Sequence, residues 1–491
     1  MTTGTLPGAV RLGLHGWLIL ITLCGATFMT GLDYSVITVA LPEIGRDLHF
    51  SGASALQWVA TACLLPTAAL MPLFGRASDM VGRRRLFIVG VVTFTVFSLL
   101  AGLAPDPGLL VAARAGQGVA AAMIGPTALA LMTAAFPEGP RRTRALGVNG
   151  ALLSLGFVVG TIGGGLITSG LNWRWTMLIL FGIGVLVMLG AITVVRETAT
   201  PSRTRLDVPG AVLASGGLFA LVYGISTGGE AGWGSLPTLA TLLAAVVLLG
   251  AFLVVESRSA APLVPLRLLR RPTVTWGMTV GLVTFGMCGG ATLLLSIHMQ
   301  DVLGYSPLQT GLGFLGEGVA ALLAGTVVAR LISAAGTVTT IVLGLAVQAV
   351  GTAAMVFLPA EGGLVTLLVT SATMGFGHVL TVVAAITTIT SGLDEADQGV
   401  AGSLAQMPTF VGAVGVAGLT AIVAARTEAL APTTTGTLAT LGGLHAAFLV
   451  AGAVALLGAV AACLLLRRTS RPRIMSRALS DQVGQVSQPV P

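Results

Sequence analysis

The residues GRASDMVGRRRLF, positions 75–87, form a charged stretch between two long apolar segments. The stretch contains two glycines, one carboxylate between them and three adjacent guanidinium groups. These residues are Gly75, Asp79, Gly82, Arg83, Arg84 and Arg85. Glycine permits a tight turn, and arginine binds lipid headgroups and the carbonyl ends of helices. We therefore predict a polar turn at a membrane surface, and from charge alone the alternative is a plain topology signal.

The composition on both sides of this turn is that of a membrane protein. Of the 491 residues, 55% are hydrophobic and 9% are charged, and the mean hydropathy is +0.95. A soluble domain carries about 25% charged residues. Apolar runs of about 20 residues, which span a bilayer as a helix, recur along the whole chain and are not explained by one signal peptide. The composition predicts an all-α integral membrane protein.

We expect fourteen spans, arranged as two six-helix halves with a central two-helix hairpin between them. The halves are predicted at 1–195 and 273–466, the hairpin with its linkers at 196–272, and a polar, disordered tail at 467–491. The expected spans are 17–41, 55–74, 86–104, 108–134, 145–171, 175–195, 209–228, 236–255, 274–297, 309–332, 338–358, 364–390, 399–425 and 445–466.

The distribution of basic residues predicts the topology. All 25 are arginines, and 21 of them lie in the two tails or in the even-numbered loops. Cytoplasmic loops collect arginine, so we predict both termini in the cytoplasm. Arginine without lysine, together with 67 glycines, is typical of a GC-rich bacterial sequence, which places the chain in a bacterial inner membrane. Because these arginines are spread between apolar spans, the net charge of +7 does not indicate a nucleic-acid partner.

The complete pattern of residues 75–87 resembles the signature loop of the major facilitator superfamily, although Ala77 and Met80 depart from it. The resemblance implies conformational gating by Gly75, Asp79, Gly82, Arg83 and Arg84. In the fourth span, Arg114 and Gln117 share one helix face and resemble the arginine motif that this superfamily uses in proton transfer.

In the resembled fold, Asp79 meets the start of the span that begins near Gly399. Both are predicted on the cytoplasmic side, and the start of a helix carries a positive dipole end. We therefore predict that Asp79 holds the two halves together when the cavity opens outward.

The fifth span has glycines at the spacing of the superfamily's antiporter motif, with a threonine where that motif has proline. Small residues let helices approach closely, so plain packing is the alternative interpretation. The motif residues are Gly147, Gly156, Gly160, Thr161, Gly164 and Gly165.

The first span contains GLDYSVITVALP, residues 31–42, which resembles the first-helix motif of the 14-helix drug:proton antiporters. Stretches that begin at Asn172, His298 and Gln398 also resemble that family, so the resemblance covers residues 15–466.

Ionisable residues inside spans are costly and indicate function. At about 1.5 Å per residue, Asp33, Arg114 and Glu317 lie roughly 12, 9 and 12 Å from the outer ends of their spans. Similar depth is compatible with an ion pair or with a shared cavity, but it establishes neither.

The resemblance implies that Asp33 and Arg114 line the cavity, where the carboxylate couples proton movement to transport. A structural buried pair is the alternative. Glu317, His378 and Gln117 are candidate substrate or proton sites, and packing explains His378 equally well.

Other residues point away from enzymatic chemistry. The sequence has no phosphate-binding glycine loop and no nucleophile motif, and its four cysteines lack metal-ligand spacing, so we expect no enzyme activity, cofactor or metal site. His298 and His445 lie near span ends and are expected to contact headgroups or water.

The resemblance implies a monomeric, proton-coupled antiporter that exports hydrophobic or amphipathic drugs, antibiotics or secondary metabolites by alternating access. Its expected partners are a small-molecule substrate, protons and membrane lipids. The alternatives are a dedicated exporter of one endogenous metabolite and a transport-dead membrane sensor.

Overall fold

A computed structural model describes residues 13–50, 53–197, 207–259, 262–393 and 397–469, and within these ranges the chain forms helices and no strands. The tail predicted to be disordered lies outside the described residues from position 470 onward. The helices are α1 Leu14–Asp47, α2 Ala53–Val81, α3 Arg83–Gly102, α4 Pro107–Ala135, α5 Pro140–Gly170, α6 Trp173–Thr193, α7 Val208–Ala231, α8 Leu236–Arg258, α9 Leu266–Leu269, α10 Pro272–Ile297, the π-helical turn η1 His298–Val302, α11 Pro307–Gly313, α12 Leu315–Ala354, the 3₁₀ turn η2 Met355–Phe357, α13 Leu364–Thr390, α14 Gln398–Val411, α15 Ala413–Leu430 and α16 Gly436–Thr469.

Polar side chains define where several helices begin. Asp106 accepts a hydrogen bond from the Leu109 amide at 3.0 Å at the start of α4. Ser306 and Gln309 form a reciprocal capping box at the start of α11. The first amides of a helix have no partner within the helix, so these side chains satisfy them at the membrane edge.

Thirteen helical segments of the described residues are long and apolar enough to cross a membrane. One of them, Leu308–Phe357, contains two predicted spans, because the backbone turns at Gly336 inside α12 with φ 82° and ψ 164°. Residues with a side chain rarely adopt a backbone conformation with positive φ, whereas glycine does so without strain. Helix α12 therefore crosses twice, and the described residues contain the fourteen crossings that the sequence predicts.

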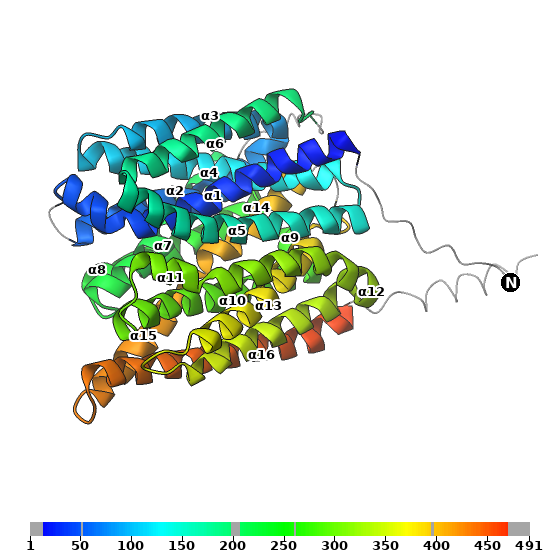
Figure 1. Ribbon diagram of the computed structural model, residues 1–491. Coiled ribbons are helices and arrows are strands. Elements are labelled where there is room, and N and C mark those ends of the chain that lie inside the picture. The colour runs from blue at the N-terminus through cyan, green and yellow to red at the C-terminus, as the bar shows by residue number, and fades with distance from the viewer. Residues whose placement is uncertain (1–12, 51–52, 198–206, 260–261, 394–396, 470–491) are drawn as a thin grey trace, which may run out of the picture.

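The helices form two bundles and a hairpin (Figure 1). Helices α1–α6 pack among themselves in the upper part of Figure 1, and α10–α16 pack among themselves mostly in the lower part, with α14 reaching into the upper part beside α4. Helix α5 packs against α12, and α2 and α4 pack against α14, so these helices join the bundles. In the hairpin, α7 packs against α8, and it also contacts α2 and α15. This is the predicted arrangement of two six-span bundles and a two-span hairpin.

Glycines on α5 bring it close to its neighbours on two sides. A Cβ at Gly156 would lie 2.5 Å from the Phe28 carbonyl oxygen of α1, and one at Gly147 would lie 2.5 Å from the Gly325 carbonyl oxygen of α12. A Cβ at Gly160 would also collide with α1. The backbones approach at distances that only glycine permits, which is how membrane helices without a hydrophobic driving force associate.

The other residues of the glycine motif have weaker packing demands. A Cβ at Gly164 would lie 3.3 Å from the nearest atoms of Val36, and one at Gly165 would meet α1 and α11 only at ordinary contact distance. The Thr161 hydroxyl donates to the Val158 carbonyl oxygen at 2.9 Å, within its own helix. Threonine therefore leaves α5 continuous at the position where the motif has proline.

Candidate functional site

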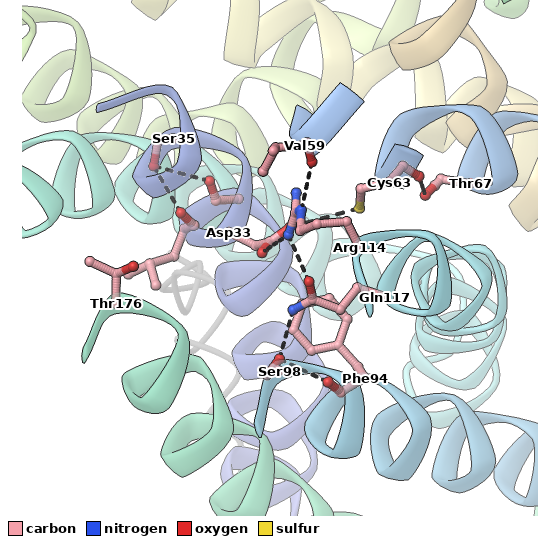
Figure 2. A network of polar contacts seen from close by, with 12 residues as sticks. Asp33, Ser35, Val59, Cys63, Thr67, Phe94, Ser98, Arg114, Gln117 and Thr176 are labelled. Carbon is pink, nitrogen blue, oxygen red and sulfur yellow. Dashed lines mark hydrogen bonds and ion pairs between the residues drawn. The ribbon is translucent and has the colours of Figure 1, made fainter. Parts of the chain in front are cut away.

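The α1–α6 bundle contains a buried ion pair between Asp33 of α1 and Arg114 of α4 (Figure 2). The Asp33 Oδ1 and Arg114 Nη1 atoms are 2.5 Å apart, and the residues are 4% and 2% exposed. Equal depth in the membrane left this contact undecided, and the structure brings the two side chains together.

Further hydrogen bonds extend from the Arg114 guanidinium to two more helices. Its Nε atom donates to the Val59 carbonyl oxygen of α2 at 3.0 Å, and Nη1 also donates to Gln117 Oε1 at 2.8 Å. Gln117 Nε2 in turn donates to the Ser98 hydroxyl of α3 at 2.8 Å. Figure 2 shows the resulting chain of contacts, which runs from Asp33 across four helices.

Arginine stays charged in proteins, so the Asp33 carboxylate compensates the buried charge of Arg114. The Val59 carbonyl oxygen and Gln117 Oε1 are further acceptors for the same guanidinium. The thiol of Cys63 lies 3.9 Å from Asp33 Oδ2.

Sequence reasoning identified Asp33, Arg114 and Gln117 and missed Ser98 and Val59. Ser98 is one of many hydroxyl residues in apolar spans, and Val59 contributes only its backbone carbonyl. Nothing in the sequence pattern distinguishes either residue.

Glu317 lies in α12 of the second bundle, between α10 and α13. A Cβ at Gly375 of α13 would lie 2.6 Å from the Glu317 Cγ, so glycine is needed to make room for the side chain. The Glu317 Oε2 atom is buried, and no described residue forms a hydrogen bond with it.

His378 of α13 belongs to a separate hydrogen-bonded cluster in the second bundle. Its Nδ1 lies 3.0 Å from the Thr284 hydroxyl of α10, which also lies 2.6 Å from Gln348 Oε1 of α12. The Phe285 ring packs edge-on against the imidazole, with ring centroids 5.0 Å apart. The contacts of Glu317 and His378 are with α10, α12 and α13, whereas those of Asp33 are with α2 and α4, so these candidates form separate sites in the two bundles.

The charged stretch 75–87 joins the two bundles at one end of the molecule. Asp79 Oδ1 accepts hydrogen bonds from Arg83 Nη2 at 3.0 Å and from the Gly399 amide of α14 at 3.2 Å. Asp79 is 5% exposed and Arg83 is fully buried. Gly82, with φ 110°, turns the chain between α2 and α3. The structure therefore contains the contact with the start of α14 that the latch prediction requires.

Two other residues of this stretch also have specific contacts. Arg84 donates to the carbonyl oxygens of Val195 at 2.6 Å and Ile192 at 2.8 Å, so it caps the end of α6. A Cβ at Gly75 would lie 2.7 Å from the Ser403 Cβ, so α2 and α14 touch closely there. We call the end that holds Arg83, Arg84, Arg142, Arg267 and Arg271 the arginine-rich end.

At the opposite end, Asp47 of α1 binds the start of α6. It accepts a hydrogen bond from Trp173 Nε1 at 2.9 Å and forms an ion pair with Arg174. These bonds, from Trp173 and then Arg174, hold the pKa of Asp47 below its usual range. Because the folded pKa is lowered, the contact stabilises the fold at neutral pH and is lost only as the pH falls through that lowered value.

One sequence-based expectation is wrong. His298 does not lie at the surface: it is fully buried in η1, and neither ring nitrogen has a hydrogen-bond partner among the described residues. The nearby His445 ring lies 2.9 Å from the Leu358 carbonyl oxygen. Position near a span end did not predict burial, because α16 packs over this turn.

Comparison with known proteins gives the class to which this fold and site belong. Residues 23–419 match the family model of the Major Facilitator Superfamily. The chain therefore belongs to this superfamily of membrane transporters, which are not enzymes.

The chain is also similar to individual proteins of known name. The chain is 37% identical over 447 residues to the puromycin resistance protein pur8 of Streptomyces alboniger, covering 89% of this chain and 88% of that protein. It is 43% identical over 309 residues to the cephamycin export protein CmcT of Amycolatopsis lactamdurans, covering 62% of this chain and 63% of that protein. The crystal structure of the human organic anion transporter MFSD10 (TETRAN) shares the fold, with a TM-score of 0.63 over 91% of this chain and 98% of that chain at 15% identity.

Proposed function

We propose that this protein is a proton-coupled antiporter that exports hydrophobic or amphipathic drugs, antibiotics or secondary metabolites. The observation that carries the proposal is the buried Asp33–Arg114 pair, with its 2.5 Å contact inside the membrane spans. A buried ionisable pair is costly in a bilayer, and in a transporter an exchange of protons explains its presence. The names of the similar proteins pur8 and CmcT, which denote puromycin resistance and cephamycin export, support the substrate class.

In the proposed cycle, a proton from outside binds Asp33 and releases it from Arg114. Loss of the carboxylate charge weakens the link between α1 and α4, and substrate leaves from the outward-open cavity. The protein then opens to the cytoplasm, where Asp33 loses the proton and pairs with Arg114 again. Val59 and Gln117 hold the guanidinium in place throughout, which makes the step reversible.

The cycle requires the two bundles to move against each other. We propose that the moving units are residues 1–195 and 273–466, connected by the hairpin region 196–272. The arginine-rich end would face the cytoplasm, as would both termini, and one chain would suffice for transport. The Asp79–Gly399 contact supports this proposal, because it joins the units at one end only.

The proposal predicts that Asp33→Asn abolishes proton-driven efflux. The amide keeps the shape of the side chain but exchanges no proton. Everted vesicles that are given a fluorescent dye or puromycin in the outer solution, and are energised by a proton gradient, measure this directly as substrate uptake. Counterflow, in which external substrate exchanges for internal substrate without a gradient, should persist and shows that the variant is folded. Accumulation by Asp33→Asn at the parental rate would exclude Asp33 as the coupling carboxylate.

A dedicated exporter of one endogenous metabolite is the second candidate. The similarity to CmcT, which is named as the exporter of a single compound, cephamycin, favours it. The same vesicles, tested with a panel of cationic dyes and antibiotics, separate the candidates. Uptake of a single compound indicates a dedicated exporter, and uptake of several unrelated compounds indicates a multidrug pump. A membrane sensor would transport none of them.

A further inference from the structure

We call two groups of described residues the closing loop: residues 391–393, which follow α13, and residues 397–399, where α14 begins. Within it, the Gly392 amide donates to Glu138 Oε1 at 3.0 Å. Glu138 follows α4 in the first bundle, so this hydrogen bond crosses between the bundles. The Gly392 carbonyl oxygen accepts from Arg271 Nη1 at 2.8 Å on the side of the second bundle. The amide and the carbonyl group of Gly392 therefore both form hydrogen bonds, and its φ of 64° is one that glycine adopts without strain.

The other end of the closing loop repeats this arrangement. The Gly399 amide donates to Asp79 Oδ1 of the first bundle at 3.2 Å. Asp397, which is 3% exposed, pairs with Arg267 at 2.8 Å. At both ends of the loop, a carboxylate of the first bundle binds a backbone amide, and an arginine that precedes α10 binds the loop from its own bundle.

Glu138 is held in position for this contact. Arg142 Nη1 lies 3.2 Å from Glu138 Oε1, while Arg142 donates to the carbonyl oxygens of Phe136 at 2.9 Å and Thr133 at 2.6 Å. The arginine therefore ties the carboxylate to the end of α4. Although the Glu138 side chain is 55% exposed, its oxygen is directed to the opposite bundle by this support.

We propose that Glu138 is a second latch residue at the arginine-rich end, which acts with Asp79 to hold the closing loop when that end is closed. A contact that exists only in the closed conformation stabilises that conformation alone, so its removal shifts the population toward the open one. The inference rests on the proposed alternating access. It concerns the opening equilibrium and does not depend on the protonation of Asp33.

A cysteine at position 403 reports this opening. Ser403 is fully buried where α2 meets α14, so Ser403→Cys should react with a soluble maleimide only when this end opens. The reaction rate is measured on purified protein in lipid nanodiscs, which requires neither a proton gradient nor transport. Protein without Ser403→Cys gives the background from the four native cysteines, and protein unfolded in detergent gives the maximal rate.

We expect Glu138→Ala to raise the labelling rate by about 3-fold to 10-fold, the range for a partly exposed, charge-assisted hydrogen bond. Glu138→Gln keeps an oxygen that accepts from Gly392, and it should stay within about 2-fold of the parent. Glu428→Ala removes an exposed carboxylate from α15 at the opposite end and should change nothing.

Two results would overturn the proposal. An unchanged labelling rate in Glu138→Ala would show that the hydrogen bond does not hold the closed end. Equal acceleration in Glu138→Gln and Glu138→Ala would show that the charge pair with Arg142 matters and the bond to Gly392 does not. Because the readout is opening and not transport, either result leaves the proton-coupling proposal to be decided by Asp33→Asn.

Discussion

Glu317 is the residue that we predict to set substrate preference. Its Oε2 atom is buried without a hydrogen-bond partner among the described residues, and we predict that it binds a cationic substrate. A buried carboxylate attracts a cation strongly where the dielectric is low. We therefore expect Glu317→Gln to reduce export of cationic dyes by about 10-fold to 100-fold, the effect of a lost charge-assisted bond of about 1.5–3 kcal/mol.

Neutral substrates provide the control for this variant in the same vesicles, since they do not need the charge. Their export should remain close to the parental rate. Equal loss for cationic and neutral substrates would make Glu317 a coupling or structural residue, and no loss for either would make it a tolerated polar group.

A second prediction at the scale of one residue concerns Asp79 and the conformational cycle. Asp79→Asn keeps an oxygen that can accept from Gly399, but it leaves the buried Arg83 without its carboxylate partner. We expect slower transport with substrate binding largely intact, because the Asp79–Gly399 contact links the two bundles and is not one of the predicted substrate sites. Rates of efflux and equilibrium binding of the same dye measure the two effects. Equal efflux rates in variant and parent would remove the latch role.

At the scale of the element, α5 tests whether close packing depends on glycine. Gly156→Ala would place a Cβ 2.5 Å from the Phe28 carbonyl oxygen, where only a backbone shift relieves the clash. Overpacking of this kind costs about 1–3 kcal/mol. We expect a lower melting temperature in detergent and reduced efflux.

Gly163 of the same helix is the matched control. Apart from its own helix, no described residue has an atom within 4 Å of the position that its Cβ would occupy. Gly163→Ala should therefore not lower the melting temperature, since alanine favours helix relative to glycine. A similar decrease in both variants would attribute the effect to α5 in general and not to its contact with α1.

At the scale of the whole molecule, the number of crossings leads to a prediction about the two ends of the chain. Fourteen crossings, with α12 counted twice, predict that both termini lie on the same side of the membrane. The arginine distribution predicts that this side is the cytoplasm. Reporter fusions at residues 1 and 491 should both be active in the cytoplasm. A periplasmic signal from one of them alone would contradict the double crossing of α12.

The sequence by itself determined that the chain crosses the membrane fourteen times and that its arginines collect at one end. It also predicted, by resemblance, which residues take part in proton coupling and gating. Only the tertiary structure decided that Asp33 touches Arg114, that Glu138 reaches Gly392 and that His298 is buried without a hydrogen-bond partner among the described residues. The physical reason is that hydropathy and charge act locally along the chain, whereas these contacts depend on which faces of distant helices meet.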